Sequence, residues 1–175
     1  MPGSSDLFDD RICSLIGGSD YKTFLDIGAG YCKMGMLVRV NKGAEAKITG
    51  IDINRAMETN MASAGYDEIV VGDAVMWLFD NPDRCFDCVF ICDCLEHLRK
   101  SDGIDVLNHL TIRSKKIVLK IPLNNKDSYL FQTGQNEYNS EAHISIWGAA
   151  DFLPFPHSYD LDGAMQYVVI TGYRR

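Results

Sequence analysis

The sequence predicts an α/β fold: a doubly wound, seven-stranded mixed sheet with helices on both faces and an antiparallel last strand. Short apolar segments typical of buried strands alternate with segments of helical periodicity through most of the 175 residues. Only Asp162-Gly163-Ala164 separates the last two apolar segments. A connection this short allows only a hairpin, so the chain closes with an antiparallel pair. The length is typical of one domain, which we expect to span residues 1–175.

The first half of the chain supplies three of the predicted strands. Glycines stand at or after the end of each helical segment, where they commonly stop helices. In order, we predict a helix over 6–17 capped by Ser5 or Asp6, a strand over 22–27, a helix over 31–41, a strand over Ala46–Ile53, a helix over Arg55–Ala64 and a strand over Glu68–Val71.

The second half continues the alternation and then changes character. We predict a helix over Ala74–Phe79, a strand over Phe86–Ile91, a helix from Ser101 to Thr111, a strand over Lys116–Ile121, a short helix over Ile146–Phe152, and strands over Ser158–Leu161 and Met165–Tyr173. Residues 123–142 are polar and longer than most connections, so we expect a substrate-side loop there. Residues 1–5 are expected to form a flexible lead.

Composition excludes several classes of function. The net charge is −7 and no basic footprint is visible, which disfavours nucleic acid as a partner. No apolar run approaches the roughly 20 residues of a membrane span. Residues 1–6 lack the basic start and apolar core of a signal peptide. We therefore expect a cytoplasmic protein without a membrane partner.

The cysteines do not indicate a metal site. Four of the six lie between Cys85 and Cys94 in a C-x2-C-x3-C-x-C pattern. Cys88 and Cys92 share one face of a predicted strand, but at strand rise they lie about 13 Å apart, too far for one ion. We interpret them as reduced, buried cysteines. No cluster of carboxylates with histidine is apparent along the chain, so we expect no catalytic metal.

A glycine turn follows the first predicted strand. Asp26 ends the apolar run, and Gly28 and Gly30 permit a backbone conformation that lets a ligand approach closely. The dinucleotide fingerprint requires a third glycine, at the position that Lys33 occupies here. An acid before the turn would repel a pyrophosphate, but it suits a ligand that carries an ammonium group. The turn therefore favours another type of nucleotide ligand.

Two further acids end predicted strands. Asp52 closes the second strand and Asp73 follows the third. The carboxyl ends of parallel strands form the ligand-binding edge of such sheets. A carboxylate at the end of the second strand can accept hydrogen bonds from both hydroxyls of a ribose. The pattern is consistent with a ligand that contains a ribose, such as an adenosine, and equally with surface acids that simply close strands.

Together these segments resemble the class I S-adenosylmethionine (SAM)-dependent methyltransferases, which have a Rossmann-like sheet closed by a hairpin. Asp26, Gly28 and Gly30 match motif I of the family, and Cys92–Leu98 matches its strand 4 motif, D-x-x-E-H. YDEIVVGDA, DCLEHLRKSDG and the pattern E-x-H-x-S-x-W-x-x-x-D-F over Glu141–Phe152 resemble a subgroup of small bacterial methyltransferases. The resemblance implies SAM as cofactor, bound by Asp26, Gly28, Gly30, Asp52, Ile53, Asp73, Ala74 and Asp93.

One residue departs from the family pattern. Cys32 stands where the family usually has a third glycine. Its Cβ would be expected to crowd the methionine part of the cofactor.

Two histidines are candidate catalytic residues. Methyl transfer to a hydroxyl requires removal of a proton, and imidazole has a suitable pKa. His97 directly follows Glu96 beside the strand 4 end, and could equally contact the cofactor or pack. His143 follows the long loop, with Glu141 and Trp147 nearby. Tyr129, Gln132, Tyr138 and Trp147 could line a sugar-like or ring substrate, or pack on one another.

The residues and the resemblance favour a methyltransferase acting on a small-molecule or saccharide acceptor, most simply at a hydroxyl, as a monomer or homodimer. The alternative is a SAM-binding protein of the same fold without methyl transfer. Lys33 and the closing hairpin disfavour a nicotinamide oxidoreductase. An amino-methyltransferase of nucleic acid is disfavoured because Asp93-Cys94-Leu95-Glu96 replaces the usual Asp/Asn-Pro-Pro-aromatic run.

Overall fold

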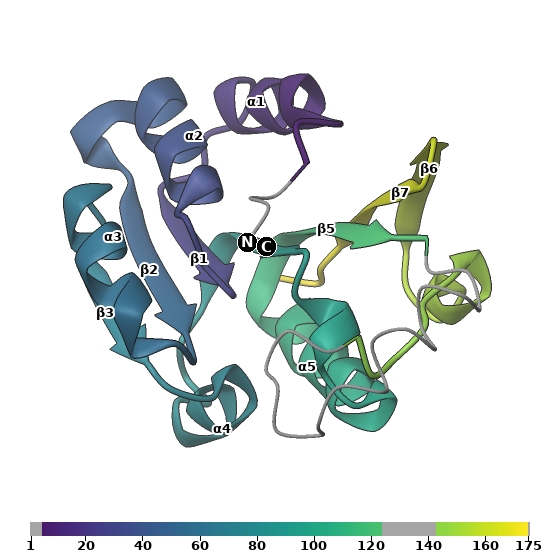
Figure 1. Ribbon diagram of the computed structural model, residues 1–175. Coiled ribbons are helices and arrows are strands. Elements are labelled where there is room, and N and C mark those ends of the chain that lie inside the picture. Colours follow the sequence, from purple (N-terminus) through teal and green to yellow (C-terminus); the bar gives the residue numbers. More distant parts are fainter. Residues whose placement is uncertain (1–4, 124–142, 175) are drawn as a thin grey trace.

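The computed structural model describes residues 5–123 and 143–174 (Figure 1). Its centre is a seven-stranded sheet in the order β3-β2-β1-β4-β5-β7-β6, and strands β1 to β5 pair in parallel. Strand β7 is antiparallel to both of its neighbours, as the short connection before it predicted. The strands are β1 (Thr23–Ile27), β2 (Lys47–Asp52), β3 (Glu68–Val71), β4 (Phe86–Cys92), β5 (Ser114–Pro122), β6 (His157–Asp162) and β7 (Met165–Thr171).

Helices cover both faces of the sheet, so the predicted fold class is confirmed (Figure 1). The α-helices are α1 (Asp9–Gly17), α2 (Lys33–Lys42), α3 (Glu58–Ser63), α4 (Ala74–Asp80) and α5 (Lys100–Arg113). Four short 3₁₀ helices complete the described elements: η1 (Gly43–Glu45), η2 (Arg55–Met57), η3 (Leu95–His97) and η4 (Ala149–Phe152). None of the helices in residues 5–123 and 143–174 combines the length and the apolar character that crossing a membrane requires.

Two apolar clusters form the core, one on each face of the sheet. On one face α1, α2 and α3 contribute Ile12, Val38 and Met61. On the other, α4 and α5 contribute Leu78 and Leu107. Each of these helices therefore buries an apolar side against a sheet that is apolar on both faces.

The first helix begins later than predicted. It begins at Asp9, and its N-cap is Phe8 in a left-handed conformation rather than Ser5 or Asp6. The Ser5 hydroxyl accepts from the Leu7 N–H at 3.2 Å, and Asp6 Oδ1 accepts from the Lys33 ammonium at 2.6 Å. The prediction of a side-chain cap was wrong because a local turn uses the Ser5 hydroxyl and a tertiary contact uses the Asp6 carboxylate.

Two other predicted helices are shorter or broken. Residues Arg55–Ala64 form η2 followed by α3, with the Asn54 side chain accepting from the Ala56 N–H. In the segment Ile146–Phe152 only η4 is helical. Trp147 is held in a non-helical conformation, since its carbonyl accepts from Gln166 Nε2 and its indole N–H donates to Ser145 Oγ.

The ring of Tyr66 occupies a gap that two glycines leave between α2 and β2. A Cβ on Gly35 would lie 2.3 Å from this ring, and a Cβ on Gly50 would lie 2.5 Å from it and 2.7 Å from Met61 Sδ. Neither glycine has a positive φ. Close packing against Tyr66, rather than backbone freedom, therefore requires glycine at both positions.

Replacing Gly50 with alanine should destabilise the fold. Overpacking of a well-packed interior typically costs about 1–3 kcal/mol, and the clash is with the buried Tyr66 ring between α2 and β2. Urea denaturation measures the change. Gly148→Ala is the control, because a Cβ there meets nothing within 4 Å. Equal stability of the two variants would contradict the packing role of Gly50.

Candidate functional site

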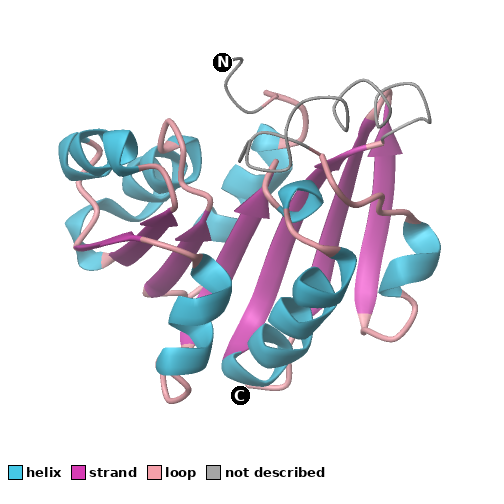
Figure 2. Cartoon of the chain, turned by 60° about the horizontal axis from the view of Figure 1, so that its bottom comes forward, coloured by secondary structure: helices cyan, strands magenta, loops and turns pink. Residues whose placement is uncertain are grey.

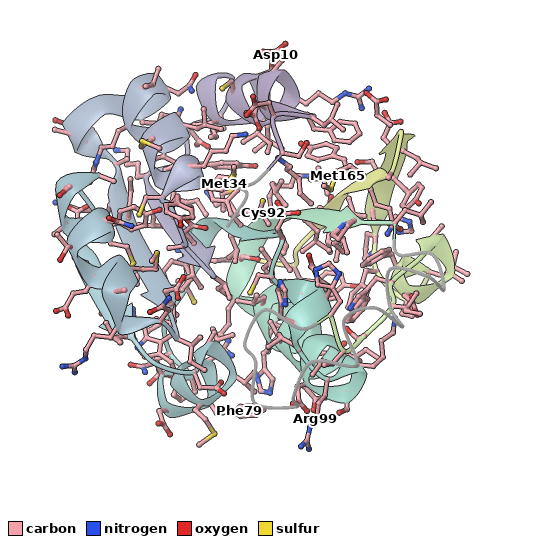
Figure 3. All side chains as sticks on the ribbon, in the orientation of Figure 1. Asp10, Met34, Phe79, Cys92, Arg99 and Met165 are labelled. Carbon is pink, nitrogen blue, oxygen red and sulfur yellow. The ribbon has the colours of Figure 1, made fainter. Side chains whose placement is uncertain are left out.

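A cavity of about 590 Å³ opens at the carboxyl ends of strands β1, β2, β3 and β4. The arrowheads of the parallel strands meet at this edge in Figure 2. The volume lies within the roughly 300–1,000 Å³ of typical small-ligand pockets. All eight predicted cofactor-binding residues line it: Asp26, Gly28, Gly30, Asp52, Ile53, Asp73, Ala74 and Asp93. Met34 and Cys92, near the middle of Figure 3, and Arg99, at its lower edge, are also among the lining residues.

The two glycines of the β1–α2 turn serve different purposes. Both have positive φ, 72° for Gly28 and 48° for Gly30. A Cβ on Gly28 would lie 2.6 Å from Cys94 Sγ, so the close approach of the chain after β4 requires glycine there. A Cβ on Gly30 would meet no protein atom closer than 3.8 Å. Only Gly30 therefore leaves open space that a ligand can use.

Asp26 lies deep in the floor of the cavity. It is only 2% exposed, and it accepts a 2.5 Å hydrogen bond from the Tyr66 hydroxyl. That hydroxyl in turn accepts from the Gly35 N–H at 3.2 Å. Burial raises the pKa of Asp26 to about 7, although the bond from Tyr66 acts in the opposite direction. The carboxyl group therefore joins β1 to α2 as well as lining the cavity.

Asp52 holds the two turns beside it in place. Its Oδ2 accepts from the Gly30 N–H at 2.7 Å, and its Oδ1 accepts from the Asn54 N–H at 2.8 Å. Each carboxylate oxygen has a further lone pair and can accept from a ligand hydroxyl. The acceptor position predicted at the end of the second strand is thus present and rigidly held.

Asp73 caps helix α4: its Oδ1 accepts from the Val75 and Met76 N–H groups at 2.7 and 3.1 Å. Ile53 and Met76 line the cavity, although they are apolar and 61% and 60% exposed. The sequence analysis missed Met76. Its position in the first turn after Asp73 is the signal that could have identified it.

Cys32 does not crowd the cavity. It adopts a left-handed conformation with φ 66°, the conformation that a glycine there would take easily. Its side chain is 1% exposed, packs with the α1–α2 core, and is not part of the lining. The expected obstruction is therefore absent from the described cavity.

Glu96, His97 and His143 come together beside the cavity. His97 lines the cavity, as does Ile144, the neighbour of His143. The two imidazole rings are edge to face with centroids 4.8 Å apart. Glu96 is 1% exposed, and its Oε1 lies 4.0 Å from His143 Nε2. Burial raises the pKa of Glu96 to about 8 and, with the nearby His97, lowers the pKa of His143.

Backbone hydrogen bonds bring these residues together. The Glu96 carbonyl accepts from the Ile144 and Ser145 N–H groups at 2.9 and 3.1 Å. Both histidines were predicted from the sequence, but Glu96 was given no role in the site. Its place as the glutamate of the D-x-x-E-H motif was the available signal, whereas the pairing of η3 with Ile144 and Ser145 is a tertiary contact that the sequence does not reveal.

Trp147 takes no part in a substrate wall. It is 1% exposed, stacks on Phe152, and has the Lys100 ammonium 3.7 Å from its ring centroid. It packs in the core, the alternative that the sequence left open. Tyr129, Gln132, Tyr138, Glu141 and all but the first residue of the predicted loop 123–142 lie outside the described residues.

Stability should fall as the Asp26 carboxyl ionises. The usual pKa of 3.8 is raised to about 7 in the folded protein, so the unfolded chain loses this proton at lower pH. Between about pH 4 and 7 the stability difference between the wild type and Asp26→Asn should therefore decline, by at most about 1.4 kcal/mol per pH unit. Urea denaturation without ligand across this range measures it. Parallel pH profiles for the two proteins would contradict a raised pKa.

Comparisons with known proteins identify the family and similar structures. A family model described as a methyltransferase domain matches residues 24–113. No curated protein matches the sequence. Among solved structures, an O-methyltransferase family protein from Burkholderia thailandensis has a TM-score of 0.72 and 14% identity. That match covers 94% of this chain and 55% of the other, so the chain spans little more than half the length of that relative.

Two further structures share the fold. The plantazolicin methyltransferase BpumL, solved in complex with SAH, has a TM-score of 0.60 and 13% identity, over 91% of this chain and 79% of that one. The small RNA methyltransferase HEN1 has a TM-score of 0.61 and 16% identity, over 100% of this chain and 27% of that one. The family match over β1 to α5 shows that the chain belongs to the methyltransferase domain family, and the solved structures share its Rossmann-like fold.

Proposed function

We propose that the protein transfers a methyl group from SAM to a hydroxyl of a small-molecule or saccharide acceptor. The observation that carries the proposal is the His97–His143 pair, which adjoins the cavity at the end of β4. SAM supplies a methyl group that its sulfonium already activates. The protein must therefore position the two reactants, exclude water and remove the acceptor's proton.

The proposed cofactor contacts follow from the cavity lining. The free lone pairs of Asp52 can accept from ribose hydroxyls. Ile53, Ala74 and the second oxygen of Asp73 form the side suited to a flat base that carries an amino group. Asp26, Gly30 and Asp93 lie on the side where an ammonium group would be favoured. Gly28 supports this arrangement by admitting Cys94 behind the turn.

His143 is the proposed base. Burial and the neighbouring His97 lower its pKa, so the imidazole is neutral at neutral pH and can take a proton. The Glu96 carboxyl is 4.0 Å away and can stabilise the charged form that results. His97, which lines the cavity, is proposed to contact both the cofactor and the acceptor.

The acceptor class, the cellular compartment and the oligomeric state are also proposed here. The net charge of −7 favours a small or saccharide acceptor over nucleic acid. All six cysteines are free, which is consistent with our proposal of a reducing, cytoplasmic setting. We propose a single domain over residues 1–175, acting as a monomer or homodimer, with the segment 123–142 on the substrate side. A protein that binds SAM without turnover remains the alternative, and product detection with candidate acceptors separates the two.

Replacing Asp52 with alanine should weaken SAM binding by at least about tenfold. The loss of charge-assisted hydrogen bonds typically costs about 1.5–3 kcal/mol, and the turns at Gly30 and Asn54 would also lose their support. Calorimetric titration with SAM measures the affinity. Asp105→Ala, at an exposed position of α5 outside the cavity lining, is the matched control. Unchanged affinity in Asp52→Ala would refute the ribose contact.

Replacing His143 with alanine should lower turnover by about 10²–10⁴ and leave SAM affinity nearly intact, as expected when a general base is lost. His97→Ala should reduce both, because His97 lines the cavity. Steady-state kinetics with an accepted substrate, together with SAM titration, separates the two effects. Full turnover in His143→Ala would show that the proton is removed elsewhere.

A further inference from the structure

We propose that Glu96, His97 and His143 form a binding site for a divalent transition-metal ion beside the cofactor cavity. One carboxylate and two imidazoles come together here from two segments of the chain: η3 carries Glu96 and His97, and His143 comes from the segment before Trp147. Within the described residues, no other group of three or more potential ligands gathers in this way. The proposal revises the expectation of a metal-free site, which rested only on spacing along the sequence.

The distances suit an ion after a small adjustment. The three ligand atoms lie within 4.8 Å of one another, and Glu96 Oε1 is 4.0 Å from His143 Nε2. With bonds of about 2.0–2.2 Å, two ligands of a tetrahedral ion lie about 3.3–3.6 Å apart. Closure of the donor atoms by up to about 1.5 Å would therefore bring all three into range. Side-chain rotation alone can supply this.

The buried carboxylate is an independent indication of a cation. Glu96 Oε2 is inaccessible to solvent and has no hydrogen-bond partner among the described residues. Leaving a buried acceptor unsatisfied typically costs about 1–3 kcal/mol, and more if the group is charged. A cation held between Glu96 and the two histidines would satisfy this oxygen. Without a cation, Glu96 Oε2 is buried with no hydrogen bond among the described residues, which destabilises the fold.

The backbone holds the three ligands in place. The Glu96 carbonyl accepts from Ile144 and Ser145, which fixes the two ligand-bearing segments against each other. Ser145 Oγ contacts the carbonyls of Leu95 and Glu96, at 3.3 and 3.4 Å, and accepts from the Trp147 indole N–H at 2.8 Å. Because Trp147 is buried in the core, the segment that carries His143 is anchored. Metal sites need this kind of support around their ligands.

The donor set indicates which ions fit. Imidazole nitrogen suits zinc, copper, iron and nickel, whereas magnesium, calcium and manganese prefer oxygen ligands. Two histidines and one carboxylate leave coordination positions open, as catalytic metal sites do. The cysteines are not part of this group: Cys92 and Cys94 line the cavity but do not join the three ligands.

The proposed role of the ion rests on the proposed function. An acceptor hydroxyl bound at an open position would lose its proton more readily, because a divalent ion stabilises the oxyanion. His143 would then be a ligand rather than the base. If methyl transfer stops in EDTA and returns when metal is added, the ion has this role. Full activity in EDTA would mean that the imidazole removes the proton, and it would overturn the catalytic part of the inference.

Metal binding itself is tested without SAM or acceptor. Protein dialysed against EDTA and then freed of it is titrated with Co²⁺, followed by calorimetry and visible absorption. We expect one site per chain, with affinity reduced at least about tenfold in Glu96→Gln and in His143→Ala. His109→Ala is the matched control, because this histidine lies on α5 outside the group, and it should bind as the wild type does.

Two results would overturn the site. One is the absence of binding up to about 1 mM Co²⁺; the other is equal binding by the wild type and both variants, which would place the ion on the free thiols instead. Thermal unfolding with and without Co²⁺ checks that each variant is folded, because an ion bound to the native state raises the midpoint. Failure of this titration would leave the proposed methyl transfer intact, and absence of methyl transfer would leave the titration result intact.

Discussion

The position of β1 between β2 and β4 is the constraint on which the site depends. Its residues pair in parallel with β2 on one side and β4 on the other. Parallel pairing brings the carboxyl ends of three strands to one edge, so the turns after Ile27, Asp52 and Cys92 open into one cavity. Phe24 and Leu25 are buried on opposite faces, and a slip of one residue would exchange these faces. The core therefore fixes the register that assembles the site.

The floor of the cavity shows how the fold accommodates buried charge. Asp26 is almost fully buried, and Asp52 lies close enough to raise its pKa further. The Tyr66 hydroxyl offsets part of this cost by donating to Asp26, and Gly35 and Gly50 leave room for the tyrosine ring. Asp52 is instead satisfied by two backbone N–H groups. The Tyr66 side chain thus holds Asp26, whereas the backbone of the turns at Gly30 and Asn54 holds Asp52.

The other end of the cavity is built from two distant segments. Ile144 and Ser145 donate hydrogen bonds to the Glu96 carbonyl in η3, and Trp147 anchors this segment in the core. This contact brings His143 to His97 and gives the buried Glu96 carboxyl two imidazole neighbours. The approach of His143 to His97 and Glu96 therefore depends on the packing of Trp147 in the core.

The sequence by itself determined the fold class and placed the predicted residues that line the cavity. Alternating apolar segments and the short connection before β7 predicted the sheet, since strand period and connection length are local properties. Asp26, Asp52 and Asp73 could be placed because each ends a strand. The cap of α1 could not be predicted because Lys33 binds the Asp6 carboxylate. The conformation of residues 146–152 could not be predicted because Ser145 and Gln166 bind the indole N–H and the carbonyl of Trp147.

Only the tertiary structure decided the acceptor side. The conformation of Cys32 keeps its side chain in the core, which the residue type alone does not reveal. Trp147 is a core residue because Gly103 leaves space for its ring. Glu96 and His143 are 47 positions apart, and spacing along the chain says nothing about their distance. They meet because backbone groups of two irregular segments pair with each other, an interaction that has no periodicity in the sequence.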